Sequence, residues 1–240
     1  MMTGLLSKRM MMINSVPHNR LLLFLVSLLF ICTTLSGQVT DFQTAWEARL
    51  MKEFKSGRDL GLSIEQRFRE NSIMYDRTMA TLEGSYKLAK GFDIDAGARW
   101  IIMKNTRLEF ENRFRLHADL NYKIPLKPLS VSLRTMVQYG FDEQVLREEP
   151  NLLKLYDRNR IELGYHFFGT KWSVQAGYEL YTQLFNHEKT AFCRSKTTAG
   201  VSYDINPRSS LNLTYLYDRE FNQANPQHAH MPTLSYSYKL

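Results

Sequence analysis

The segment from Glu109 to Ile124 alternates between apolar and polar residues along its whole length. One set of alternate residues, starting at Phe110, is apolar apart from Asn112, whereas the other set is polar and carries both signs of charge. Because successive side chains of a strand point to opposite faces, the pattern predicts one long strand with an apolar face and a charged face. Globular strands usually have roughly five or six residues, so this length is typical of a transmembrane β-barrel with lipid outside.

The same alternation recurs along the chain, for example over residues 41–55, 60–69 and 155–167. We count about eleven such segments, joined alternately by short and long links, as in outer-membrane barrels with short periplasmic turns and longer extracellular loops. The predicted fold class is therefore all-β, a transmembrane antiparallel β-barrel of about 10–12 strands. Single-chain bacterial barrels have even strand numbers, so a count of eleven implies a missed or split strand, or an atypical first segment at Asp41.

Residues 1–37 have the composition of a secretory signal peptide. Basic residues precede an apolar run over 21–32, and small or polar residues then lead to Gly37. The apolar run is too short for a membrane-spanning helix. We therefore expect cleavage after Gly37 and a barrel domain over residues 38–240. Removing the three basic residues of this leader lowers the formal net charge from +7 to +4.

Charge and cysteine content exclude several classes of protein. The charges outside the leader alternate in sign along the strands instead of clustering, so we expect no nucleic-acid surface. Cys193 is the one cysteine after the leader, so no internal disulfide is predicted. A soluble ligand-carrying barrel would have a polar outer face and an apolar interior, which the leader and the aromatic bands disfavour.

Aromatic residues collect at the ends of the predicted apolar faces. Two rings of amphipathic aromatics are expected where a barrel crosses the two interfaces of a bilayer. The residues assigned to these girdles are Trp46, Phe54, Tyr86, Phe92, Trp100, Phe110, Tyr122, Trp172, Tyr203, Tyr217 and Tyr238.

The polar register is dense in charge and is predicted to face the lumen. The charged cluster assigned to it comprises Glu47, Arg49, Glu65, Arg67, Glu83, Arg99, Glu111, Arg113, Arg115, His117, Asp119, Arg158, Arg160 and Glu162. In a narrow barrel such charges are expected to pair across the lumen and to plug it. The alternative is a narrow solute-selective channel, porin-like, with an arginine-rich lining. We favour the plug because the two signs are roughly balanced.

The histidines allow two sharper hypotheses, neither of which we favour. His117 and His166 lie in the polar register, where a histidine beside an acid can act as a general base, but no nucleophile motif accompanies them. A lipid-modifying envelope enzyme is therefore the less favoured alternative. His187, His228 and His230 fall in predicted loops, where solvation is favoured over metal binding. No catalytic residue, metal or cofactor is predicted.

Four short motifs carry a resemblance to a known family. They lie at residues 111–115 (ENRFR), 156–160 (YDRNR), 217–222 (YDREFN) and 236–240 (YSYKL). Through them the chain resembles the outer-membrane barrels of Bacteroidota known as domain of unknown function 2490. The resemblance implies an outer-membrane barrel, and it brings no catalytic residues and no known activity. The chain ends on Leu240, where such barrels commonly end on an aromatic residue.

These observations predict an outer-membrane β-barrel protein of a Gram-negative bacterium, with a structural or accessory role and a largely plugged lumen. The expected partners are outer-membrane lipid and the barrel-assembly machinery, with no nucleic acid. The sequence predicts neither the solute nor the oligomeric state.

Overall fold

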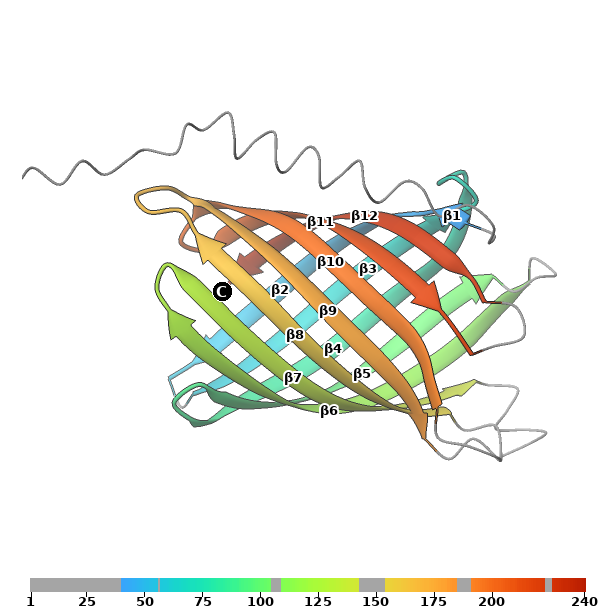
Figure 1. Ribbon diagram of the computed structural model, residues 1–240, viewed down its shortest axis with the longest axis horizontal. Helices are drawn as coiled ribbons and strands as arrows, with labels where there is room; N and C mark the ends of the chain where they lie inside the picture. Colours follow the sequence, from blue (N-terminus) through green and yellow to red (C-terminus); the bar gives the residue numbers. More distant parts are fainter. Residues whose placement is uncertain (1–39, 56, 105–108, 143–153, 185–190, 223–225) are drawn as a thin grey trace, which may run out of the picture. The chain divides into compact units, whose positions relative to one another are not determined.

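The described residues form one β-barrel (Figure 1). The computed structural model describes residues 40–55, 57–104, 109–142, 154–184, 191–222 and 226–240. The predicted signal peptide, residues 1–37, lies outside these residues, as does His187. The described residues contain no helix that is long and apolar enough to cross a membrane.

Twelve strands make up the sheet, and their bounds agree closely with the segments predicted from alternation. They are β1 (Thr40–Phe42), β2 (Thr44–Phe54), β3 (Arg58–Arg69), β4 (Met74–Ala89), β5 (Phe92–Lys104), β6 (Phe110–Leu126), β7 (Leu129–Asp142), β8 (Lys154–His166), β9 (Trp172–Leu184), β10 (Ala191–Asn206), β11 (Ser209–Glu220) and β12 (His228–Lys239). The central segment predicted at 109–124 corresponds to β6, with 17 residues the longest strand.

Strands β2 to β12 pair with their sequence neighbours in antiparallel fashion, and β12 then pairs with β2 to close the sheet. This last pairing is parallel, because an odd number of up-and-down strands leaves the first and last strands pointing the same way. The all-β barrel fold is confirmed. The predicted range of 10–12 strands is also confirmed: the barrel has eleven strand positions, because β1 and β2 share one, and the first segment is the atypical one. The even strand number that is usual in single-chain bacterial barrels does not apply here.

A proline explains why β1 and β2 are separate. Both strands pair with β12 in the same register, Phe42 opposite His230 and Ala45 opposite Thr233, so they are one strand with a gap in its ladder. Pro232 lies opposite that gap and has no N–H group to donate. The sequence pattern placed His228 and His230 in a loop; this was wrong, because β12 begins at His228, before the proline.

The two ends of the barrel differ in their connections. At one end, which we call the short-turn end, the strands are joined by residues 55–57, 90–91, 127–128, 167–171 and 207–208. The other end, the long-loop end, carries the connections 70–73, 105–109, 143–153, 185–190 and 221–227. The last strand finishes at the short-turn end, whereas β1 starts at the long-loop end (Figure 1).

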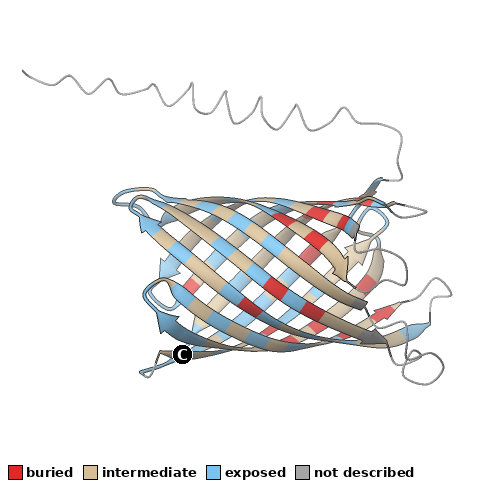
Figure 2. Cartoon of the chain, turned by 60° about the horizontal axis from the view of Figure 1, so that its bottom comes forward, coloured by how far each residue is buried: buried red, intermediate tan, exposed pale blue. Residues whose placement is uncertain are grey.

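The outer face is mostly apolar and the inner face is mostly polar, so burial alternates along many of the strands (Figure 2). Asn112, the exception in the apolar register, accepts a hydrogen bond from the indole nitrogen of Trp100 at 3.1 Å. Polar side chains on this face pair with one another elsewhere too, because Thr135 donates to Asn159 at 2.9 Å and Asn159 donates to Asp157 at 2.7 Å. Aromatic side chains on neighbouring strands also pair near the short turns. The ring centroids of Phe92 and Tyr122 are 4.2 Å apart, and those of Trp172 and Tyr203 are 4.7 Å apart.

The outward register can be tested at Ala96, which lies near mid-strand on the outer face of β5. We expect Ala96→Arg to impair assembly in membranes, because arginine at the midplane of a bilayer costs about 2–4 kcal/mol on the lipid face of a barrel. Ala96→Leu is the matched control and should assemble like the parent. The measurement is the heat-modifiable folded fraction in isolated membranes; equal assembly of both variants would show that Ala96 does not face lipid.

The parallel seam can be tested by crosslinking in a Cys193→Ser background. Ser235 and Glu47 are Cα partners across the seam, so Ser235→Cys with Glu47→Cys should form a disulfide under mild oxidation. In the control, Ser235→Cys with Met51→Cys, the two positions are displaced by four residues, about 13 Å along the strand, and should stay reduced. A crosslink in the control alone would contradict the parallel register.

Candidate functional site

The residues predicted to line the lumen all lie in strands, in the register opposite the exposed apolar residues. Their ion pairs differ from expectation, because they run along one strand or between nearby strands rather than straight across the lumen. Same-strand pairs are Arg49–Glu47, Arg67–Glu65, Arg113–Glu111 and Arg160–Glu162, at 2.5–3.7 Å. Residues two apart on a strand share a face, within easy reach of an arginine side chain.

Strands that are three or four positions apart around the barrel still act on each other at longer range. The Lys196 ammonium on β10 attracts the Glu65 carboxylate on β3, and the Arg67 guanidinium attracts the Asp218 carboxylate on β11. The lumen is therefore lined by charge networks that compensate each other partly within a wall and partly between walls.

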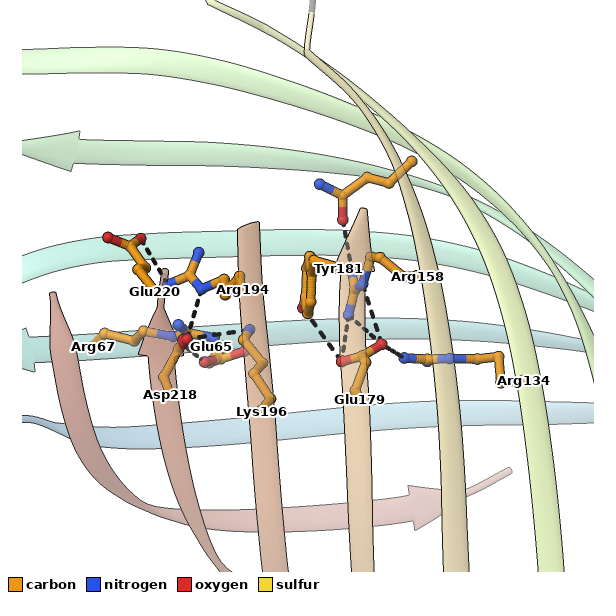
Figure 3. Close-up of polar contacts among 11 residues, drawn as sticks. Glu65, Arg67, Arg134, Arg158, Glu179, Tyr181, Arg194, Lys196, Asp218 and Glu220 are labelled. Carbon is orange, nitrogen blue, oxygen red and sulfur yellow. Dashed lines mark hydrogen bonds and ion pairs between the residues drawn. The ribbon is translucent and has the colours of Figure 1, made fainter. Parts of the chain in front are cut away.

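Glu179 is the centre of the tightest of these networks (Figure 3). It accepts hydrogen bonds from Arg134 on β7 at 2.5 Å and from Arg158 on β8 at 2.9 and 3.0 Å. The Tyr181 hydroxyl donates to the same carboxylate at 3.3 Å, and Arg158 also donates to the Gln138 side chain at 2.6 Å. Only 6% of Glu179 is exposed, so two arginines compensate one buried carboxylate.

Asp218 is the centre of a second network, also drawn in Figure 3. Arg194 donates to it at 2.6 Å, and Lys196 lies 3.7 Å from it. The ring of Tyr181 joins the two networks, because Arg158 lies 4.4 Å from its centroid, Lys196 5.2 Å and Arg194 6.0 Å. A buried aromatic ring can stabilise cations in this way.

These networks border a cavity of about 370 Å³ in the half of the lumen nearer the long-loop end. Its basic lining residues are Arg67, Arg77, Arg99, Arg113, Arg115, Arg158, Arg194 and Lys196. Its acidic lining residues are Asp41, Asp218 and Glu220. The cavity therefore has a strongly basic wall, and it gathers five residues of the predicted charged cluster in one place.

The other members of the predicted cluster lie elsewhere. Glu83, His117 and Asp119 lie near the middle of their strands, and there the His117 Nε2 atom is 3.7 Å from a Glu83 carboxylate oxygen. These two residues reach each other across β5 at Gly97, where a Cβ atom would come within 2.5 Å of the His117 ring. Gly97 thus leaves room for the imidazole.

His228 and His230 bind tyrosines on β11. The Tyr217 hydroxyl lies 2.8 Å from Nδ1 of His228, and the Tyr215 hydroxyl lies 2.5 Å from Nδ1 of His230. Among the described residues, no group of three or more histidine, cysteine or acidic side chains is placed to hold a metal ion.

Several lumen residues were absent from the predicted cluster. Arg134, Glu179, Tyr181, Lys196 and Asp218 have the same alternation signal as the residues that were included, so the register alone could have found them.

The inner face also contains apolar side chains that alternation did not predict. Met79, Ile101 and Met103 form a buried cluster on β4 and β5, and Ala45, Leu216 and Met231 form another on β2, β11 and β12.

Comparison with known proteins agrees with this architecture. The family described as "Protein of unknown function (DUF2490)" matches residues 44–229. The chain belongs to this family. The match covers every strand from β2 to β11 and the start of β12, and it confirms the resemblance carried by the short motifs. No curated protein matches the chain.

Solved structures show the porin-like fold of this family member. The NanC porin is 14% identical, with a TM-score of 0.51, covering 83% of this chain and 99% of that one. A bacterial polysaccharide outer membrane secretin is 11% identical, with a TM-score of 0.42 and 73% of each chain covered. An anion-selective porin from Comamonas acidovorans is 9% identical, with a TM-score of 0.37, covering 75% of this chain and 53% of that one. The NanC match, with its TM-score above 0.5, supports the fold.

The Glu179 network should be a main source of barrel stability. Glu179→Ala removes one partner and leaves Arg134 and Arg158 uncompensated, which costs about 3–5 kcal/mol when such a pair is wholly buried. We expect a clear fall in the unfolding temperature of the detergent-solubilised barrel. Glu53→Ala is the control, since Glu53 pairs with Lys239 at 3.0 Å in an exposed position, where a pair contributes about 0–1 kcal/mol. An equal fall in unfolding temperature in both variants would contradict a special contribution of the Glu179 network to stability.

Proposed function

We propose that this DUF2490 protein is a barrel of the bacterial outer membrane with a structural or accessory role, and that its lumen is closed to free diffusion. The short-turn end faces the periplasm and the long-loop end faces outward, as in other barrels of that membrane. The exposed apolar outer face, the paired aromatics near the short turns and the porin-like fold support this location.

The observation that carries the proposal is burial inside the barrel at mid-height. Thr81 on β4, Asp119 on β6 and Glu179 on β9 point inward from the middle of their strands, and only 4%, 7% and 6% of each is exposed. Side chains around a wide aqueous pore would be hydrated, as in porins. The middle of the lumen is therefore filled by side chains from several walls.

Planar-bilayer recording tests the proposal. The purified parent barrel should give no regular single-channel steps across a lipid bilayer, whereas Glu179→Gly, which shortens the central side chain, should give small steps if the network forms the constriction. Glu53→Gly is the matched control, because Glu53 lies outside the network, and it should stay silent. A well-defined conductance in the parent protein would overturn the closed lumen.

A narrow anion-selective channel is the second candidate. The basic wall of the 370 Å³ cavity favours it, because arginine-lined constrictions select anions. In that case, the parent channel would open with a preference for anions over cations, measured as the reversal potential in a salt gradient.

A further inference from the structure

Arg99 and Arg115 form an unusual pair in the cavity wall. They are Cα partners on β5 and β6, and both are half-buried and point inward. Like charges placed directly opposite each other on neighbouring strands are destabilising. Two guanidinium groups in this arrangement require compensation from another source.

The described part of the chain provides little of that compensation. Arg99 donates to the Thr81 hydroxyl at 2.9 Å, and within the described residues neither Arg99 nor Arg115 has a carboxylate oxygen within 4.0 Å. Glu65 and Glu47 attract Arg99 from greater distances, but Glu65 already pairs with Arg67 at 2.5 Å and Glu47 with Arg49 at 3.2 Å. The charged groups that act most strongly on Arg115 include Arg99, Arg77 and Arg67, all of them cationic.

The other basic groups of the cavity are different, because each one has an acidic partner. The pairs are Arg67–Glu65, Arg77–Asp76, Arg113–Glu111, Arg158–Glu179, Arg194–Asp218 and Lys196–Asp218. Arg99 and Arg115 are thus the two basic lining residues that have no carboxylate oxygen within 4.0 Å among the described residues.

We propose that this half of the lumen binds a small tetrahedral dianion, a phosphate or a phosphate monoester, between Arg99 and Arg115. Two positive charges match one dianion, and the planar fork of a guanidinium matches the geometry of phosphate oxygens. The site goes beyond the proposed function, since it binds the anion whether or not the lumen conducts.

The size of the cavity helps to distinguish inorganic phosphate from a phosphate monoester. About 370 Å³ lies within the range of roughly 300–1,000 Å³ found for small-molecule sites, and it exceeds what a single inorganic ion needs. Tyr156 also lines the cavity and offers an aromatic side chain to an organic group. A phosphate monoester therefore fits better than inorganic phosphate, although both share the anionic group that the arginines recognise.

Thermal unfolding of the full barrel in detergent tests the site. The probes are inorganic phosphate, glucose 6-phosphate and, as the reference, sodium chloride at matched ionic strength. A ligand that binds the folded state raises the unfolding temperature by mass action, so both phosphates should raise it above the chloride value, and glucose 6-phosphate should do so at a lower concentration. Equal unfolding temperatures in all three solutions would overturn the proposal, whereas an effect of inorganic phosphate alone would exclude the monoester.

The double variant Arg99→Gln with Arg115→Gln tests whether these two arginines bind the phosphate group. Its affinity for the phosphates, measured by isothermal titration calorimetry, should fall at least about tenfold, the loss expected when charge-assisted hydrogen bonds are removed. In chloride alone the variant should unfold no lower than the parent, because the repulsion between the two arginines is gone. Arg49→Gln, outside the cavity lining, is the matched control and should bind like the parent. Unchanged affinity in the double variant would place the anion elsewhere.

Discussion

Every backbone N–H and C=O group of a chain inside hydrocarbon needs a partner within the protein, and a closed sheet is one of two ways to provide it. Here the closure depends on β12 reaching β2 and β1, and it is made by parallel pairing. Pairing in parallel is slightly less stable per residue than in antiparallel strands. Side chains reinforce this seam, because Ser235 donates to Glu47 and Lys239 donates to Glu53, each at 3.0 Å.

Closure of the sheet brings the polar side chains of all strands into the small volume of the lumen. Charged side chains of opposite sign therefore lie close enough to form networks. Glu179 and Asp218 each gather two cations, and Tyr181 lies between the two groups. The cavity wall at one end of the lumen has more basic than acidic side chains. Within the described residues, Arg99 and Arg115 are the two of these basic side chains that form no ion pair with a carboxylate. A count of total charge would not reveal this imbalance.

Alternation in the sequence predicted the barrel, the strand bounds and the inward register, because a period of two determines the face of each residue. It did not predict partners. Arg113 pairs with Glu111 on its own strand, and only the three-dimensional arrangement shows that Arg115, two residues later, faces other arginines. Local irregularities were also hidden from the pattern: Pro232 divides the first strand, and a bulge near Arg67 turns Asp76 and Arg77 to the interior together.

The odd strand number separates the two ends of the chain's folded part. Thr40 lies at one mouth of the barrel and Lys239 at the other, whereas in an even-stranded barrel both would lie at the same mouth. The eleven residues of β2 alone extend about 35 Å, comparable to the thickness of a bilayer core. A short peptide therefore cannot join the two ends to make a circularly permuted barrel, and in the proposed outer-membrane location reporter domains fused to the two ends would lie on opposite sides of the membrane.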